Sequence, residues 1–258
     1  VLNVVRTARD KRPGIPVINI DYSDLPADIM WSYPQLKGID NVFNFKRSMV
    51  DSKLKKINSF THHINHAPFC VRDDIHEQQN KLYKPYKNRK YIVSTFFPEN
   101  DGITERIVKY SSQPEHVIWK ESNARLYVAS VVSLCDYDKH VGYTASINNP
   151  MAQPGPQGRS GANIDVKGSM QYNYCDICTD SKIIVTAQPK PYEGDWRLME
   201  AMTSGALVMH NKMVLPPAGL IDGKHWVLYN SIKDLRDKIE YYANRPGEAL
   251  KIANTGKD

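Results

Sequence analysis

The sequence predicts an α/β fold with parallel sheets, divided into a small domain over residues 1–87 and a larger domain over residues 88–258. Short β-branched runs alternate with helical stretches, most regularly after residue 90, and this alternation favours parallel strands joined by right-handed crossovers. The chain of 258 residues, 41% hydrophobic and 24% charged, is long enough for one large or two small hydrophobic cores. The stretch 80–90 is basic and tyrosine-rich, and we expect it to link the two domains.

The elements of the small domain are predicted from short local patterns. Residues 17–20 and 42–45 are β-branched or aromatic runs of the strand type. Asp73 is a suitable N-cap for a short helix that ends at Gln79.

The larger domain has a more regular order of elements. We expect strands at residues 91–97, 116–119 and 224–229, helices at 104–111, 169–179 and 232–243, an apolar run at 126–134 and a glycine-rich loop at 151–168. Irregular loops of that length are usually functional or mobile.

The segment 181–208 is the most informative part of the chain. Residues 183–185 predict a buried strand, and the prolines that follow predict a loop. Asp195 is a plausible N-cap for a helix over residues 196–203, which Gly205 would end. The loop and the helix start therefore follow the carboxyl end of a strand, which is where open α/β sheets bind ligands.

Charged residues gather at this predicted edge. Arg197 lies in the first turn of the helix, where the free N–H groups and the helix dipole already favour an anion. Its forked guanidinium suits a diphosphate, and Glu200, on the same helix face, can accept hydrogen bonds from a ribose diol. Glu193 precedes the helix. The alternative for Arg197 and Glu200 is an ordinary surface ion pair, which the same spacing also produces.

Two further groups of residues have the composition of a metal site. Asp136 and Asp138 follow the apolar run, interpreted here as a strand, and could hold Mg²⁺ or Mn²⁺, although a loop of solvated acids is favoured. His62 and His66 would share a helix face with His63 beside them, but no acidic or thiolate partner has suitable spacing for zinc.

Two other motifs remain. Cys175 and Cys178 are expected to be buried structural cysteines, because Cys175 lies in mid-helix and not at a helix N-terminus that would stabilise a thiolate. Arg159 lies in a Gly-Arg-Ser-Gly loop and could approach a phosphate, with a solvated loop tip as the alternative.

The composition narrows the choice of partners and compartment. The net charge of +6 and the pI of about 9.0 suggest an anionic ligand or surface without choosing one. No apolar run is long enough to span a bilayer, and we expect no membrane span and no nucleic-acid partner. Four scattered cysteines and no visible signal peptide predict a cytoplasmic protein. Since Val1 is not a natural initiator, we expect a piece of a longer protein.

The segment EGDWRLMEAMTSGALVMHNKM resembles the donor-binding half of GT-B glycosyltransferases, near the exostosin-like and spore-maturation-type families. The matching positions are Ser181–Ile183, Gly194, Asp195, Arg197, Glu200, Ala201 and Ser204–Val208. The tail from Gly219 is similar as well, with its Gly-Lys strand, its Asp-Leu helix start and its final Pro-x-Glu helix. The match is close over residues 181–256 and loose over 88–256.

The resemblance implies two Rossmann-like domains with a nucleotide-sugar donor between them and with neither a bound metal nor another cofactor. It implies that Glu200 holds the ribose and Arg197 the diphosphate, with Gly194 and Asp195 in the donor loop. Retaining members carry two glutamates separated by seven residues. Only six residues separate Glu193 from Glu200, and this departure favours an inverting, exostosin-like enzyme.

The expected reaction is transfer of a sugar from a UDP-sugar to a glycan or another hydroxyl acceptor. An inverting transfer needs a general base, for which Asp73, Asp21 and His66 are candidates, and Arg47 and Arg159 are further phosphate ligands. One alternative is a metal-dependent GT-A-type transferase that uses Asp136 and Asp138. The other is a non-catalytic sugar- or nucleotide-binding module of a longer protein.

Overall fold

The computed structural model describes residues 2–21, 42–46, 64–66, 71, 73–97, 124–143, 169–187, 196–213 and 216–258. The chain forms two compact units, which are described separately. The first consists of residues 1–69 with 191–193 and 213–218, and the second of residues 70–190, 194–212 and 219–258. The second unit thus begins at Cys70, whereas the boundary predicted from the sequence lies between residues 87 and 88.

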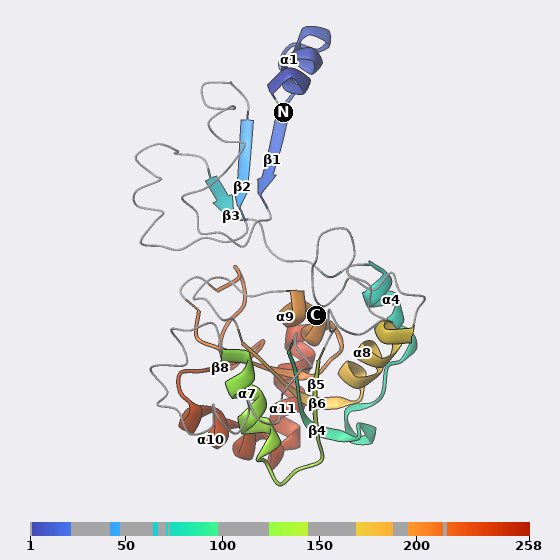
Figure 1. Cartoon of the computed structure of the whole chain (residues 1–258), viewed down its shortest axis with the longest axis vertical. Coiled ribbons are helices and arrows are strands. Elements are labelled where there is room, and N and C mark those ends of the chain that lie inside the picture. The colour runs from blue at the N-terminus through green and yellow to red at the C-terminus, as the bar shows by residue number, and fades with distance from the viewer. Residues whose placement is uncertain are drawn as a thin grey trace. The chain divides into compact units, whose positions relative to one another are not determined.

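The first unit contains a helix and a parallel three-stranded sheet (Figure 1). The elements are α1 (Leu2–Lys11), β1 (Val17–Asp21), β2 (Val42–Lys46) and β3 (Ile64–His66), with strand order β1-β2-β3. The predictions of strands at residues 17–20 and 42–45 are therefore confirmed. Asp21 is aligned with Lys46, and Lys46 with His66, so these three residues lie side by side at the carboxyl edge of the sheet.

The second unit is a parallel five-stranded sheet with helices on both faces (Figure 1). Its strands are β4 (Tyr91–Phe97), β5 (Lys139–Tyr143), β6 (Ser181–Thr186), β7 (Leu207–Asn211) and β8 (Val227–Tyr229), in the order β5-β4-β6-β7-β8. Its helices are α4 (Asp73–Lys81), the 3-10 turn η1 (Tyr86–Asn88), α7 (Ala124–Ser133), α8 (Ser169–Thr179), α9 (Trp196–Thr203), α10 (Ile232–Ala243) and α11 (Pro246–Lys257). The predicted α/β class with parallel sheets is confirmed.

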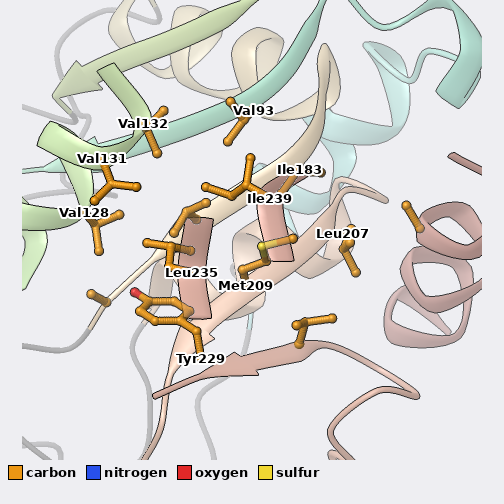
Figure 2. Packing of buried hydrophobic residues seen from close by; sticks show 14 of the residues in the cluster. Val93, Val128, Val131, Val132, Ile183, Leu207, Met209, Tyr229, Leu235 and Ile239 are labelled. Atoms are coloured by element: carbon orange, nitrogen blue, oxygen red, sulfur yellow. The ribbon is translucent and has the colours of Figure 1, made fainter. Parts of the chain in front are cut away.

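The core of the second unit is formed by the sheet and the helices α7, α10 and α11 (Figure 2). Alternate residues of a strand point to one face of the sheet, so Ile183 and Val185 of β6 reach this core together. Valines of α7 and Leu235 and Ile239 of α10 pack against them. The helices α8, α9 and α11 contact strands β6 and β7, and α4 packs on α8 and α9.

Three sequence interpretations are wrong. His66 is the last residue of strand β3 and is not in a helix. The apolar run 126–134 is not a strand but most of helix α7, which covers the sheet with its valines. The stretch 80–90 is not a linker, because it belongs to the second unit and its residues Tyr86 and Arg89 are buried there. By contrast, α8, α9 and α10 have the predicted bounds, and the last strand begins at Val227 instead of Lys224.

Candidate functional site

The order of the strands defines where the five-stranded sheet can bind a ligand. The chain enters the sheet at β4, continues to β5 on one side, and then crosses to β6 on the other side. In parallel α/β sheets the crevice outside the carboxyl ends of the two strands at such a switch point is the usual ligand site. Here those ends are Phe97 and Thr186.

Helix α9 is the first helix after the switch-point strand β6, and it packs on β6 and β7. Arg197 lies in its first turn and is only 6% exposed. Glu200 lies one turn later and is 1% exposed. The structure thus places the two residues favoured by the sequence on one helix beside the ligand-binding edge, and both are buried, unlike the members of an ordinary surface ion pair.

Glu200 is held by a tyrosine from the neighbouring helix α8. The Tyr174 hydroxyl donates a 2.8 Å hydrogen bond to Oε2 of Glu200. Burial raises the pKa of Tyr174 well above its ordinary value, and the charge of Glu200 raises it further. Tyr174 is therefore a neutral donor at physiological pH. Its ring packs edge-on against Phe96 of β4, with centroids 5.0 Å apart.

A glutamine from helix α4 fixes the backbone of α9. Gln79 Nε2 donates a 2.8 Å hydrogen bond to the carbonyl oxygen of Glu200, and Gln79 Oε1 accepts one of 2.6 Å from the Thr203 hydroxyl. Gln79 is buried, so neither bond competes with bulk water. The side-chain amide therefore ties two positions of the last turn of α9 to α4.

Other polar groups lie at the carboxyl edge and were not identified from the sequence. The Tyr229 hydroxyl at the end of β8 donates a 2.9 Å bond to the carbonyl oxygen of Thr186. His210 Nδ1 donates to the carbonyl oxygen of Asn211 at 2.7 Å. The buried Thr186 hydroxyl has no hydrogen-bond partner among the residues that the structure describes. Their sequence signal is a polar residue at or near the end of an apolar strand.

Asp136 and Asp138 are at the opposite edge of the sheet. They follow helix α7 and precede β5, and the carbonyl oxygen of Asp138 accepts from the backbone N–H groups of Ile92 and Val93 near the start of β4. Because the apolar run before them is a helix, the premise that they follow a strand is wrong. Within the described residues, no group of three or more His, Cys, Asp or Glu side chains is arranged to hold a metal ion.

The two cysteines of α8 are buried, as predicted. Burial raises the pKa of Cys175 to about 12, and burial also raises the pKa of Cys178 well above its ordinary value. Both are thus thiols and not thiolates at neutral pH, which agrees with the structural role predicted for them.

The remaining predicted residues are distributed between the units. Asp21 and His66 share the carboxyl edge of the three-stranded sheet, whereas Asp73 lies exposed in the first turn of α4 in the second unit. The other candidates lie outside the described residues: Arg47, His62, His63, Arg159, Glu193, Gly194 and Asp195.

Of the helices in the described ranges, none has both the length and the apolar character needed to cross a membrane.

The part of the chain that contains α8, β6 and α9 decides the comparison with known families. Residues 153–258 match the glycosyl transferase-like family. This glycosyl transferase-like segment includes Tyr174, Arg197 and Glu200. No curated protein sequence matches the chain significantly.

The chain is also similar to solved structures. The glycosyltransferase from Rickettsia africae ESF-5 is 12% identical, with a TM-score of 0.50 over 99% of this chain and 74% of that one. TarM is 14% identical, with a TM-score of 0.47 over 93% and 50% of the two chains. The sucrose-phosphate synthase from Thermosynechococcus elongatus is 13% identical, with a TM-score of 0.43 over 87% and 54%. The chain spans about half the length of the last two proteins.

Proposed function

We propose that this chain is the donor-binding part of a glycosyltransferase that uses a nucleoside-diphosphate sugar, with UDP as the nucleotide. One observation carries the proposal. A buried arginine and a buried glutamate lie on the helix that follows the switch-point strand, inside the segment that matches the glycosyl transferase-like family. The fold similarity to the Rickettsia africae glycosyltransferase supports the same assignment.

The proposed roles follow from the chemistry of the two side chains. Arg197 is in the first turn of α9, where a guanidinium and the positive end of the helix dipole together favour a diphosphate. Glu200 accepts hydrogen bonds from the ribose hydroxyls, since an ionised carboxylate is only an acceptor. A low exposure of both groups strengthens such contacts, because water competes less for them.

For the acceptor side we propose an inverting transfer to a glycan hydroxyl. The base removes the acceptor proton while the hydroxyl oxygen attacks the anomeric carbon, and the diphosphate leaves with the electron pair of the broken bond. The candidates for this base are Asp73, Asp21 and His66; Asp21 and His66 share the carboxyl edge of the three-stranded sheet, and Asp73 lies in the first turn of α4. Lys46 lies between Asp21 and His66 in the strand register.

We further propose that the transfer needs no metal. Asp136 and Asp138 are the acidic pair with the spacing of a metal site, and they lie at the amino edge of the sheet, away from the switch-point ends of β4 and β6. Arg197 and the N-terminus of α9 then neutralise the leaving diphosphate instead of a cation.

Thermal unfolding with a panel of UDP-, GDP- and ADP-sugars tests the donor class. A ligand present at about 100 times its dissociation constant adds about 2.7 kcal/mol of stability, so the correct donor raises the melting temperature. We expect UDP-sugars to give the largest shift, with the same shift in EDTA. A shift that disappears in EDTA would support the metal-dependent alternative, and no shift with any donor would reject the proposal. Donor binding without transfer to any acceptor would instead favour a binding module.

A further inference from the structure

We infer that Tyr174 is a positioning residue that sets the carboxylate of Glu200 for a ribose diol and thereby makes the site selective for ribonucleotides. The inference rests on the proposed function, because it takes Glu200 as the ribose contact. It assigns a role to Tyr174 of α8, which lies outside the motif in α9 and outside the site predicted from the sequence.

The contact is specific to one atom of the carboxylate. The Tyr174 hydroxyl donates to Oε2 of Glu200 at 2.8 Å, within a region where Tyr174 is 5% and Glu200 1% exposed. A carboxylate accepts hydrogen bonds at both oxygens, with about four lone-pair positions in all. The bond from Tyr174 therefore fixes the orientation of the group, and a carboxylate can accept more than one hydrogen bond.

The donor is itself held in place. Its ring packs edge-on against Phe96 at the switch-point strand β4, and the thiol of Cys178 lies next to its hydroxyl. Gln79 at the same time holds the carbonyl oxygen of Glu200, so both the backbone and the side chain of this residue are fixed by neighbouring helices. Contacts from α4 and α8 thus converge on one residue of α9.

This arrangement has a consequence for ligand choice. A carboxylate that is held before the ligand arrives binds without losing rotamer freedom, so the two hydroxyls of a ribose gain the full benefit of the contact. A 2′-deoxyribose offers one hydroxyl fewer to the same acceptor. The discrimination between the two sugars therefore depends on Tyr174, although Tyr174 itself does not contact the ligand.

The experiment measures this discrimination by calorimetry in the whole chain. The probes are UDP, GDP and ADP, each with its 2′-deoxy counterpart, and the ribonucleotide that binds the wild type most tightly is used throughout. We expect Tyr174→Phe to weaken the binding of that ribonucleotide about tenfold and the binding of its 2′-deoxy form less than about threefold. The reason is that a hydrogen bond to a charged group is worth about one order of magnitude in affinity. Tyr174→Phe keeps the ring against Phe96 and removes only the hydroxyl.

Two variants separate positioning from stability. Thr179→Val also removes a buried hydroxyl from α8. Among the described residues, this hydroxyl bonds only to carbonyl oxygens of its own helix, so we expect both affinities to be unchanged. In a Glu200→Ala background, which has no side-chain acceptor for the Tyr174 hydroxyl, Tyr174→Phe should no longer change the preference for ribose, because the two residues act through one contact. This background also provides a test if Tyr174→Phe alone lowers the fraction of folded protein.

The outcomes distinguish the inference from the proposed function. Suppose that the wild type binds a ribonucleotide, and that Tyr174→Phe binds both the ribonucleotide and its 2′-deoxy form with the wild-type dissociation constants. Tyr174 then has only a structural role and the inference is wrong, while the proposed function stands. If the effect of Tyr174→Phe persists in the Glu200→Ala background, Tyr174 does not act through Glu200 and the inference is also wrong. If the wild type binds none of the three ribonucleotides, both the proposed function and the inference are rejected.

Discussion

The Arg89 guanidinium donates a 2.8 Å hydrogen bond from Nη2 to the carbonyl oxygen of Ser204, directly after the end of helix α9. Nη1 donates to the carbonyl oxygen of Ser181 at the start of β6, also at 2.8 Å, and Nε donates to that of Lys84 at 3.1 Å. Burial lowers the pKa of Arg89, yet the guanidinium stays charged because its ordinary value is so high. One buried cation thus joins the end of helix α9 to the sheet.

Replacement of Arg89 by methionine is expected to lower the free energy of unfolding by about 3 kcal/mol, because buried carbonyl oxygens lose charge-assisted donors. Urea unfolding followed by circular dichroism measures the loss. Arg236→Met is the matched control, since Arg236 lies exposed on α10, and it should change stability by less than about 0.5 kcal/mol. Equal midpoints for the two variants would contradict the role assigned to Arg89.

Gly256 in α11 lies against the turn before β8. A Cβ atom at this position would overlap the carbonyl oxygen of His225, which is backbone and cannot rotate away. We expect Gly256→Ala to destabilise the protein by about 2 kcal/mol despite the better helix propensity of alanine.

The control lies in the same helix. A Cβ at Gly247 would meet no atom within 4 Å, so Gly247→Ala should leave the unfolding midpoint unchanged or raise stability by up to about 1 kcal/mol. If both substitutions raise the urea midpoint, the close approach of Gly256 to the His225 carbonyl oxygen does not limit the stability of the protein.

Arg197→Ala is expected to weaken UDP binding by about 1.5–3 kcal/mol, roughly tenfold to a hundredfold, through loss of a charge-assisted contact to the diphosphate. Isothermal calorimetry at a temperature where both proteins are folded measures the difference. Arg197→Lys keeps the charge without the fork and should bind with intermediate affinity. An unchanged dissociation constant in Arg197→Ala would show that the diphosphate site lies elsewhere.

The sequence predicts those parts of the fold and site that depend on local signals. The bounds of α8, α9 and α10 agree with the prediction, and Gly205, with a φ of 74°, ends α9 as expected because it adopts a left-handed conformation. Arg197 and Glu200 are found on one helix face because their spacing alone decides it.

Interactions between distant segments could not be predicted in this way. The apolar run 126–134 contains adjacent valines, which suit a buried strand as well as a buried helix. Whether this run is a strand or a helix decides at which edge of the sheet Asp136 and Asp138 lie. Tyr174 lies 26 residues before Glu200, and no periodicity shows that its hydroxyl reaches that carboxylate. Arg89 looks like one basic residue of a charged stretch until the structure shows the carbonyl oxygens around it.

Asp180 connects the amino ends of β4 and β6 to the residues before β4. Its Oδ2 accepts a 2.8 Å bond from Lys84 Nζ, and its Oδ1 accepts one of 2.8 Å from the Lys90 backbone N–H. Burial raises the pKa of Asp180, but these hydrogen bonds and the lysine charges together outweigh burial, so the pKa lies below its ordinary value. A carboxylate with a lowered pKa in the folded state stabilises the protein above its unfolded pKa, and this contribution is lost as the pH falls through the folded value.

Asp180→Asn is therefore expected to destabilise the protein by about 1–2 kcal/mol at pH 7, with the difference from the wild type shrinking below about pH 4 as the wild-type carboxylate becomes protonated. Unfolding midpoints in urea between pH 7 and pH 3 measure this dependence. Asp237→Asn is the control, because the ion pair of Asp237 with Lys233 is exposed and separated by only four residues on α10, so it should change stability little at any pH. A difference between Asp180→Asn and the wild type that stays constant down to pH 3 would mean that the charge of Asp180 does not contribute, and that the cost comes from the altered packing alone.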